Sequence, residues 1–287
     1  MASPVSLVHS LSPPARHAHH TSLVADVCSI MLSDALIITS WGAGEILAFA
    51  ALVLTILVNI GQISQNIVSR NIYYAELDLT NFEATLRAQA GSAGGVSGVY
   101  ASDQSSPLGQ SQGLRNTYQW GLYNYCGGQN EDQNRACVDS RFGAGRFQPA
   151  ETIYADLPTE YQTLFNQTVS QGTFADSSYL GRFSHAAFYL VFVGTVLAGV
   201  TFLVVFLAHR FAFLCAALTA LAGAACIGAG AAIYTAILVK TRDSIESLGG
   251  AELTLNNALW MLWAAFGSLA LAIVPLILSC CFGRNKY

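Results

Sequence analysis

Four long runs of apolar residues dominate the pattern of this chain. They cover residues 42–63, 184–208, 211–239 and 258–281. The first run contains a single acid, Glu45, close to its edge, and the other three contain no Asp, Glu, Lys or Arg. A transmembrane helix needs about 20 mostly apolar residues, and the buried helices of soluble proteins are shorter. The pattern therefore predicts four membrane-spanning helices that pack as a bundle.

The residues before the first run divide into two parts. Residues 1–21 are rich in Ser, Pro and His, a composition that favours disorder. Residues 22–40 place Ser22, Asp26 and Ser33 on one helical stripe, which predicts an amphipathic helix in the membrane interface. An extension of the first span is the alternative interpretation of this segment.

The long connection between the first two spans indicates the orientation in the membrane. This loop, residues 64–183, contains Cys126 and Cys137, and its Asn166 begins the glycosylation sequon Asn-Gln-Thr. A close cysteine pair and a sequon fit the oxidising, extracellular side. Both termini are then expected in the cytosol. The same topology predicts a short extracellular loop and a cytosolic tail, at 240–257 and 282–287.

The long loop has the pattern of a folded domain with one insertion. Residues 91–113 contain six Gly, six Ser and three Gln, which predicts a flexible segment. Four aromatic residues between Tyr118 and Tyr125 favour strands, and they are expected to form the domain core or, alternatively, a ligand surface. A disulfide between Cys126 and Cys137 would close a hairpin-like loop and contribute roughly 3 kcal/mol to stability.

One segment of this loop resembles a known signature. Gly121-Leu122-Tyr123-Asn124-Tyr125-Cys126, followed by Cys137, is similar to the claudin-type pattern Gly-Leu-Trp-x-x-Cys…Cys. Tyr123 replaces the signature tryptophan, and Trp120 lies too close to match the earlier claudin tryptophan. The long loop and the Tyr-Asn-Tyr-Cys variant resemble the fungal PalI/Sur family of claudin-like proteins. The resemblance implies an all-α transmembrane four-helix bundle with a claudin-like extracellular loop domain, built from a small β-sheet and short helices.

The resemblance also implies a function. Members of this family are structural proteins of the plasma membrane, where some associate with eisosomes and support cell wall organisation. We therefore expect a protein that organises a membrane domain together with lipids, other membrane or cortical scaffold proteins, and further copies of itself. Two alternatives remain: an accessory subunit of ambient-pH signalling, and a channel or regulator of calcium entry during cell fusion.

Composition and charge exclude several other classes. Charged residues make up 10% of the chain, against about 25% in soluble domains. A net charge of −4 offers no basic surface for nucleic acid. Spans without charges disfavour a pump or transporter. The sequence carries no phosphate-binding loop and no metalloprotease or hydrolase motif. We expect no enzyme activity, no cofactor and no metal.

Two further patterns concern the third and fourth spans. Small residues recur at four-residue spacing in the third span, namely Ala216, Ala220, Ala224 and Gly228. Such rows allow close helix packing, either within the bundle or between copies of the chain. Cys280 and Cys281 end the fourth span on the expected cytosolic side, which makes them candidate palmitoylation sites. Packing at the membrane edge is the alternative role for these two cysteines.

Overall fold

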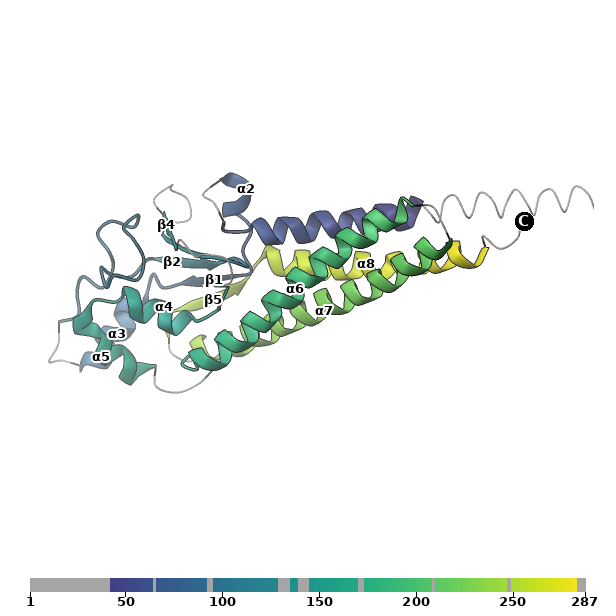
Figure 1. Ribbon diagram of the computed structural model, residues 1–287. Coiled ribbons are helices and arrows are strands. Elements are labelled where there is room, and N and C mark those ends of the chain that lie inside the picture. The colour runs from purple at the N-terminus through teal and green to yellow at the C-terminus, as the bar shows by residue number, and fades with distance from the viewer. Residues whose placement is uncertain are drawn as a thin grey trace, which may run out of the picture.

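The computed structural model has two parts, a bundle of four long helices and a smaller domain at one end of it (Figure 1). We call the smaller part the sheet domain, because it consists of a five-stranded sheet and the short helices α2–α5. The structure describes residues 42–63, 66–91, 95–128, 135–138, 145–169, 173–207, 210–246 and 249–282. The predictions for residues 1–21, for residues 22–40 and for the tail after Phe282 lie outside these ranges.

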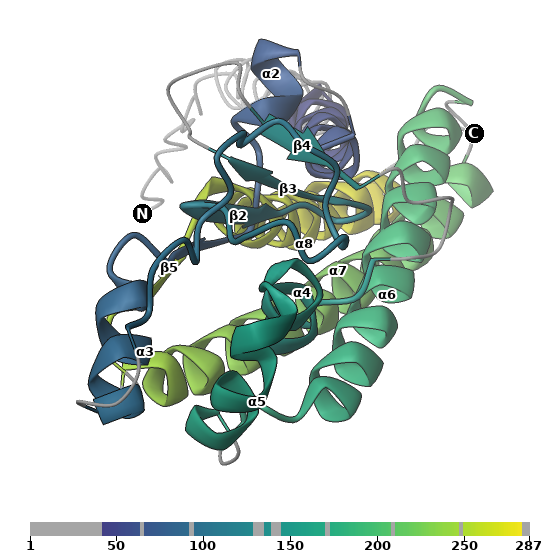
Figure 2. The same ribbon diagram turned by 90° about the vertical axis from the view of Figure 1, so that its left-hand side faces the viewer.

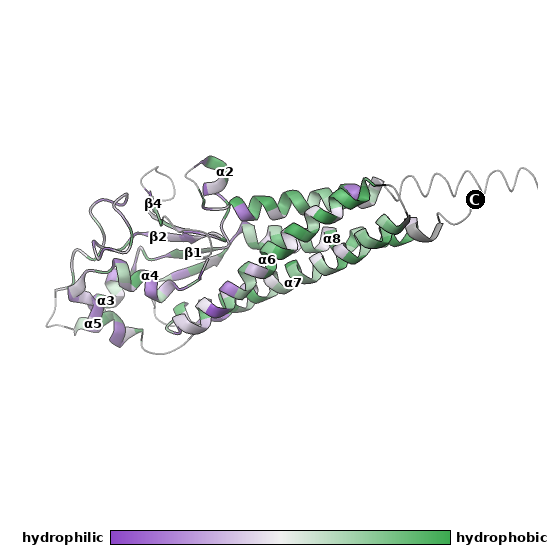
Figure 3. Cartoon of the chain, in the orientation of Figure 1, coloured by the Kyte–Doolittle hydropathy of each residue, from purple (hydrophilic) through white to green (hydrophobic). Residues whose placement is uncertain are grey.

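The bundle confirms the four predicted spans. Its helices are Gly42–Ile60, α6 (Ser177–Val205), α7 (Arg210–Glu246) and α8 (Asn257–Phe282). Each is long and apolar enough to cross a membrane, so the chain is a multi-pass membrane protein. The helices α6 and α7 extend beyond their apolar runs at the end near the sheet domain. Figure 3 shows hydrophilic residues gathered in that region and apolar residues along the bundle.

Small residues bring α7 close to its neighbours within the chain. The alanines of the predicted small-residue row are buried, namely Ala216, Ala220 and Ala224. A Cβ atom at Gly228 would lie 2.8 Å from Cδ2 of Phe266 in α8. A Cβ atom at Gly230 would lie 2.7 Å from Cγ2 of Val191 in α6. The row therefore packs inside the bundle, where a larger side chain would push the helices apart.

The sheet domain is built on an antiparallel sheet with the strand order β4-β3-β2-β1-β5. Its strands are β1 (Ala75–Asp78), β2 (Thr117–Trp120), β3 (Tyr125–Gly128), β4 (Arg135–Cys137) and β5 (Glu252–Leu255). In the central strand β1, Leu77 pairs with Tyr118 on one side and with Leu253 on the other. These three side chains are buried, so one face of the sheet contributes directly to the core.

The edge strand β5 comes from the loop between the third and fourth spans, which the sequence suggested only as a short loop at 240–257. It lies directly before α8, and its backbone hydrogen bonds to β1 therefore join the sheet to the start of the fourth span. The main-chain N–H of Asn256 also donates to the carbonyl of Tyr74 at 3.1 Å. Both connecting loops thus belong to one domain.

Four short helices complete the sheet domain. They are α2 (Ile67–Arg70), α3 (Phe82–Ala90), α4 (Pro149–Asp156) and α5 (Thr159–Thr168). Proline suits the first turn of α4, where its missing N–H leaves no helical hydrogen bond unmade. Phe82 of α3 meets Phe165 of α5 edge to face, with 6.1 Å between the ring centroids. Figure 2 shows α4 between the sheet and α6.

The segment 91–113, predicted as a flexible insertion, packs against the sheet domain in its described part. Within residues 95–113, Val96 and Val99 are 3% and 0% exposed. The Tyr100 hydroxyl donates to the carbonyl of Leu79 at 2.5 Å, and Tyr100 forms an isolated bridge with Leu114. The abundant Gly and Ser suggested flexibility, but two buried valines and a bonded tyrosine fix this segment to the domain. Residues 92–94 lie outside the described part.

Candidate functional site

A disulfide joins the two outermost strands at one edge of the sheet. Cys126 of β3 stands directly opposite Cys137 of β4, with 4.0 Å between their Cα atoms, and the two are bonded. The predicted Cys126–Cys137 pair is therefore confirmed. Sγ of Cys126 also lies 4.0 Å from the carbonyl oxygen of Gln62, which follows the first membrane helix. The disulfide thus fixes the sheet edge that faces this helix end.

The aromatic residues of β2 form the centre of the domain core. Tyr118 and Trp120 are 0% and 1% exposed, and their ring centroids lie 6.1 Å apart. The Trp120 ring meets Phe147 edge to face at 5.2 Å. Aromatic pairs of this geometry add about 0.5–1.5 kcal/mol beyond their buried area. Because both side chains are enclosed, the cluster serves core packing and offers no surface to a ligand.

Gly121 of the signature lies against the backbone that leaves the first membrane helix. A Cβ atom there would lie 2.6 Å from the carbonyl oxygen of Gly61 and 2.7 Å from Cβ of Gln62. Leu122 follows and is 2% exposed, so it also packs inward. The glycine and leucine of the signature are therefore explained by close contact between the β2–β3 turn and the bundle.

Tyr123, which replaces the signature tryptophan, connects the sheet domain to two membrane helices. Its hydroxyl donates to Oδ1 of Asn59 at 2.9 Å, and its ring meets Phe188 of α6 edge to face at 5.0 Å. Nδ2 of Asn59 in turn donates to Oγ1 of Thr195 in α6 at 3.0 Å. Tyr123 is therefore a docking residue. Asn59 is not among the residues that the sequence singles out, and its place as a lone asparagine near the end of an apolar run is the one local feature that distinguishes it.

Tyr123→Phe is expected to weaken this docking modestly. The variant keeps the ring against Phe188 but loses the hydroxyl bond to Asn59, at a cost of about 0.5–1.5 kcal/mol. The measurement is thermal unfolding of the purified protein in detergent micelles. Tyr161→Phe is the matched control, because its hydroxyl donates to the Ser97 carbonyl at an exposed position, and it should change the midpoint less. Equal midpoints for Tyr123→Phe and the wild type would contradict the docking role.

A chain of polar side chains crosses the sheet behind the disulfide. One guanidinium nitrogen of Arg135 donates to Oε1 of Gln119 at 2.7 Å and to Oε1 of Gln62 at 3.2 Å. Nε2 of Gln119 donates to Glu76 at 3.1 Å. Burial lowers the pKa of Arg135, with a smaller contribution from the positive charge of Arg70, but arginine stays protonated. No sequence pattern indicates this network, because charged residues in loops usually lie on the surface.

A second buried network joins α4 to β2. Oδ2 of Asp156 accepts a hydrogen bond from the Tyr118 hydroxyl at 2.6 Å, and its Oδ1 accepts one from the main-chain N–H of Gly109. The Tyr118 hydroxyl accepts from the N–H of Arg115, which is itself fully buried. Burial raises the pKa of Asp156, and the hydrogen bonds from Tyr118 and Gly109 oppose that shift. Burial also raises the pKa of Tyr118, and the neighbouring Asp156 raises it further.

Asp156→Asn is expected to flatten the pH dependence of stability. Because the folded pKa of Asp156 lies above the ordinary value of 3.8, the folded state holds the proton more tightly than the unfolded chain. The resulting stability is complete below that ordinary value and is lost as the pH rises through the raised pKa. The variant loses this contribution, so its unfolding midpoint should fall less as the pH rises from the ordinary pKa through the raised pKa of Asp156.

The control for that experiment is Asp103→Asn. Hydrogen bonds from Ser105 lower the pKa of the exposed Asp103 carboxyl, so its contribution has the opposite sign. Its stability is present above the ordinary pKa and is lost as the pH falls through the lowered pKa. Removing Asp103 should therefore act at pH values below the ordinary pKa and leave the decline above it nearly unchanged. An unchanged slope in Asp156→Asn would contradict the raised pKa.

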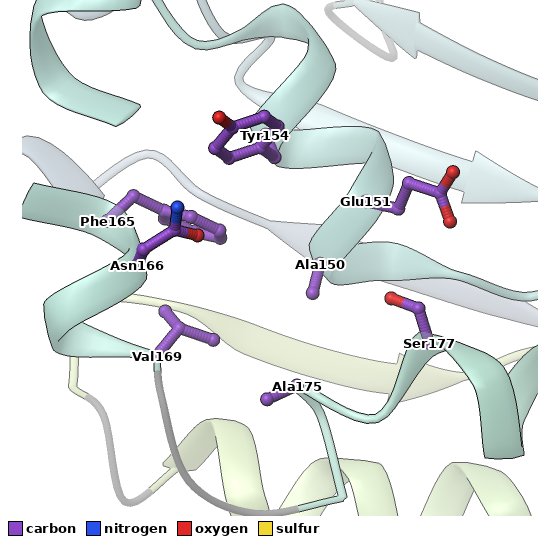
Figure 4. A pocket seen from close by; sticks show the side chains of 8 residues that line it. All are labelled: Ala150, Glu151, Tyr154, Phe165, Asn166, Val169, Ala175 and Ser177. Carbon is purple, nitrogen blue, oxygen red and sulfur yellow. The ribbon is translucent and has the colours of Figure 1, made fainter. Parts of the chain in front are cut away.

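The predicted glycosylation site lies at the rim of a cavity of about 300 Å³ between α4, α5 and the start of α6. Asn166 is exposed on α5, and Figure 4 shows it beside Phe165, opposite Tyr154 of α4. Glu151 points away from the middle of this cavity (Figure 4). The walls combine apolar and polar side chains without an arrangement of acid, base and nucleophile. The accessible amide of Asn166 is compatible with an attached glycan.

The two candidate palmitoylation cysteines lie at the end of α8. The side chains of Cys280 and Cys281 lie outside the described part, although their backbone belongs to α8. Among the described residues, no group of three or more His, Cys, Asp or Glu side chains could hold a metal ion. Cys215 and Cys226 are free cysteines of α7.

Four spans, a disulfide-linked antiparallel sheet whose strands β1–β4 lie between the first two spans, and a signature that docks the sheet on the bundle define a claudin-like four-helix membrane protein. A family model described as the SUR7/PalI family matches residues 43–281. The chain belongs to this family, as its signature predicted, and the family is one of structural membrane proteins. A search among curated proteins finds no match.

Proposed function

We propose that this protein organises a domain of the plasma membrane, of the eisosome or cortical-patch type, and thereby supports cell wall integrity. The observation that carries the proposal is the fixed attachment of the sheet domain to the bundle. Tyr123 contacts Asn59, Gly121 lies against Gly61, and strand β5 leads directly into α8. Because these contacts between the sheet domain and the bundle are close-packed, a partner bound to the sheet domain would position the membrane helices as well.

The interior of the bundle supports an organising role over ion conduction. Buried threonine hydroxyls in the described part of the bundle donate to carbonyl oxygens of their own helices: Thr55 to Ala51 at 3.0 Å and Thr201 to Leu197 at 2.9 Å. A conducting path needs polar groups turned toward water. The outer surface carries large apolar side chains, with Leu203 66% exposed, as expected for contact with lipid.

In this proposal the sheet domain faces the cell wall, and both termini lie in the cytosol. The disulfide and the accessible Asn166 support that orientation, because both modifications arise on the secretory side. The expected partners are membrane lipids, other membrane or cortical scaffold proteins and further copies of the chain. An Asn166→Gln variant that migrates like the enzymatically deglycosylated wild type would support this side of the membrane. A wild type without glycan would remove that support.

The experiment that tests the function is imaging of the full chain, fluorescently tagged at its C-terminus, in a fungal host that lacks its own members of the family. The expected result is discrete, slowly exchanging patches that coincide with a tagged eisosome scaffold, together with restored resistance to cell-wall stress. A uniform distribution over the plasma membrane would overturn the proposal. Restored growth at alkaline pH without patches would favour the pH-signalling alternative, and altered calcium uptake without patches would favour the calcium alternative.

A further inference from the structure

A second cavity, of about 350 Å³, lies where α6 leaves the sheet domain. Its volume is at the lower end of pockets that hold small ligands, about 300–1,000 Å³. Polar and cationic side chains dominate its lining, which includes Arg146, Gln148, Ser177, Ser178, Arg182 and His185. Arg146, Ser178 and Arg182 are exposed, and the contacts described above for the core and for the docking of the sheet domain do not involve them.

Two arginines of the lining form no ion pair among the described residues. Arg146 and Arg182 are exposed, and neither belongs to the ion pairs found there. Two acids adjoin the lining in the chain without pairing with either arginine: Asp176 accepts from the N–H of Tyr179 at 2.8 Å. Glu151 accepts from Nε2 of Gln148 at 2.7 Å. Two arginines in one cavity are suited to an anion, because each guanidinium can donate two parallel hydrogen bonds to a phosphate.

Below the cavity, the same face of α6 becomes an apolar stripe. The positions that follow Arg182 and His185 at helical spacing are exposed, namely Tyr189, Val193, Val196 and Val200. The His185 ring contacts the Tyr189 ring at a centroid distance of 4.8 Å. Arg182 is also the last charged residue before the uncharged run that crosses the membrane. A cationic cavity therefore stands directly above a lipid-facing stripe, at the boundary of the bilayer.

We propose that this cavity binds the phosphate group of a membrane phospholipid, whose acyl chains lie along the apolar stripe of α6. Two guanidinium groups can hold a phosphodiester through paired, charge-assisted hydrogen bonds, and such bonds do not depend on the surface charge of the leaflet that faces the sheet domain. The stripe decides between a lipid and a soluble phosphate, because only a lipid would bury Tyr189 and Val193 as well. The proposal concerns a lipid site and does not rest on the organising function.

The test is native mass spectrometry of the full-length protein, released from detergent micelles after incubation with a stated lipid. The probes are phosphatidylglycerol, a diacylglycerol with the same acyl chains, and inorganic phosphate. The expected result is one retained phosphatidylglycerol and neither of the other two probes. Binding of the diacylglycerol to the same extent would show a general apolar surface and overturn the proposal. Retention of inorganic phosphate alone would also overturn it, because the stripe would then have no role.

Variants locate the site. The double variant Arg146→Gln/Arg182→Gln should weaken retention of phosphatidylglycerol by about fivefold for each arginine removed. The control is Arg87→Gln/Arg242→Gln, which removes the same charge at exposed positions outside the cavity and should bind like the wild type. Equal retention by both double variants would overturn the proposal.

A second variant distinguishes a loss of lipid binding from a loss of folding. Ser178 is exposed in the first turn of α6 and lines the cavity, so Ser178→Glu introduces a carboxylate without removing a buried contact. An acid near a helix N-terminus is also tolerated by the helix dipole. This variant should unfold at the wild-type temperature and still lose phosphatidylglycerol by repulsion. Wild-type retention in Ser178→Glu would contradict a phosphate in this cavity.

Discussion

Replacement of both disulfide cysteines, Cys126→Ala/Cys137→Ala, is expected to lower the free energy of unfolding by about 3 kcal/mol. The bond closes a loop between positions that are 11 residues apart, and opening it returns that conformational freedom to the unfolded chain. The loss concentrates at the edge of the sheet, where β4 pairs only with β3. Thermal unfolding in detergent, followed by the fluorescence of the buried Trp120, measures the change.

Reduction of the wild type provides the control. A reductant should move the unfolding midpoint of the wild type close to that of the double variant and leave the variant unchanged. Alkylation before and after reduction should reveal two further thiols in the wild type alone. The free cysteines Cys215 and Cys226 are present in both proteins and serve as an internal reference. A variant as stable as the oxidised wild type would show that the strand pairing holds the edge without the bond.

The sequence predicts the membrane-spanning part of this fold well, for a physical reason. Lipid cannot hydrogen bond to the backbone, so a span has to be a long helix of apolar residues, and both features are local. The Cys126–Cys137 pair is also local, because its two strands form one hairpin. The signature added the family, since its Gly, Leu and Cys lie in one short segment.

The contacts that hold the sheet domain to the bundle are not local, and the sequence does not reveal them. Asn59 and Tyr123 are separated by 64 positions, and Asn59 and Thr195 by 136. Strand β5 is four residues long and pairs with a strand from the other loop. Its short alternation of polar and apolar residues also occurs in many surface loops. Pairing of this kind depends on where the helices bring the loops, which no local pattern records.

Composition misleads where a few residues decide the structure. The segment 91–113 is dominated by Gly and Ser, yet its described part is packed through Val96 and Val99. Asp156 and Arg115 were overlooked for the opposite reason, because charged residues are rarely buried. Here Asp156 accepts from the Tyr118 hydroxyl, and the two terminal nitrogens of the Arg115 guanidinium donate to main-chain carbonyls. The candidate site was therefore found at the signature, whereas its supporting networks became visible only in the structure.

Gly121→Ala is expected to destabilise the sheet domain by about 3 kcal/mol, the upper part of the range for overpacked positions. The added Cβ would lie 2.6 Å from the carbonyl oxygen of Gly61, and backbone yields less than a side chain. The turn at Gly61 cannot retreat, because a Cβ there would already meet the carbonyl of Ile72 at 2.6 Å. The N–H of Gln62, in the same turn, donates to the carbonyl of Ser69 at 2.9 Å. The strain should therefore separate the sheet domain from the bundle.

Gly95→Ala is the matched control, with the same chemical change in the same loop. Gly95 is exposed, and no atom lies within 4 Å of an added Cβ. At such a position alanine restricts the unfolded chain and should leave stability unchanged or raise it by about 0.4–1 kcal/mol.

The two variants are compared by thermal unfolding and by the rate of proteolysis within the loop 64–183. A clearly lower unfolding midpoint in Gly121→Ala alone would establish that the contact between the signature and the bundle holds the sheet domain in place. Similar midpoints for the two variants would show that the turn at Gly61 moves freely, and the sheet domain would then be tethered to the membrane helices without a fixed orientation.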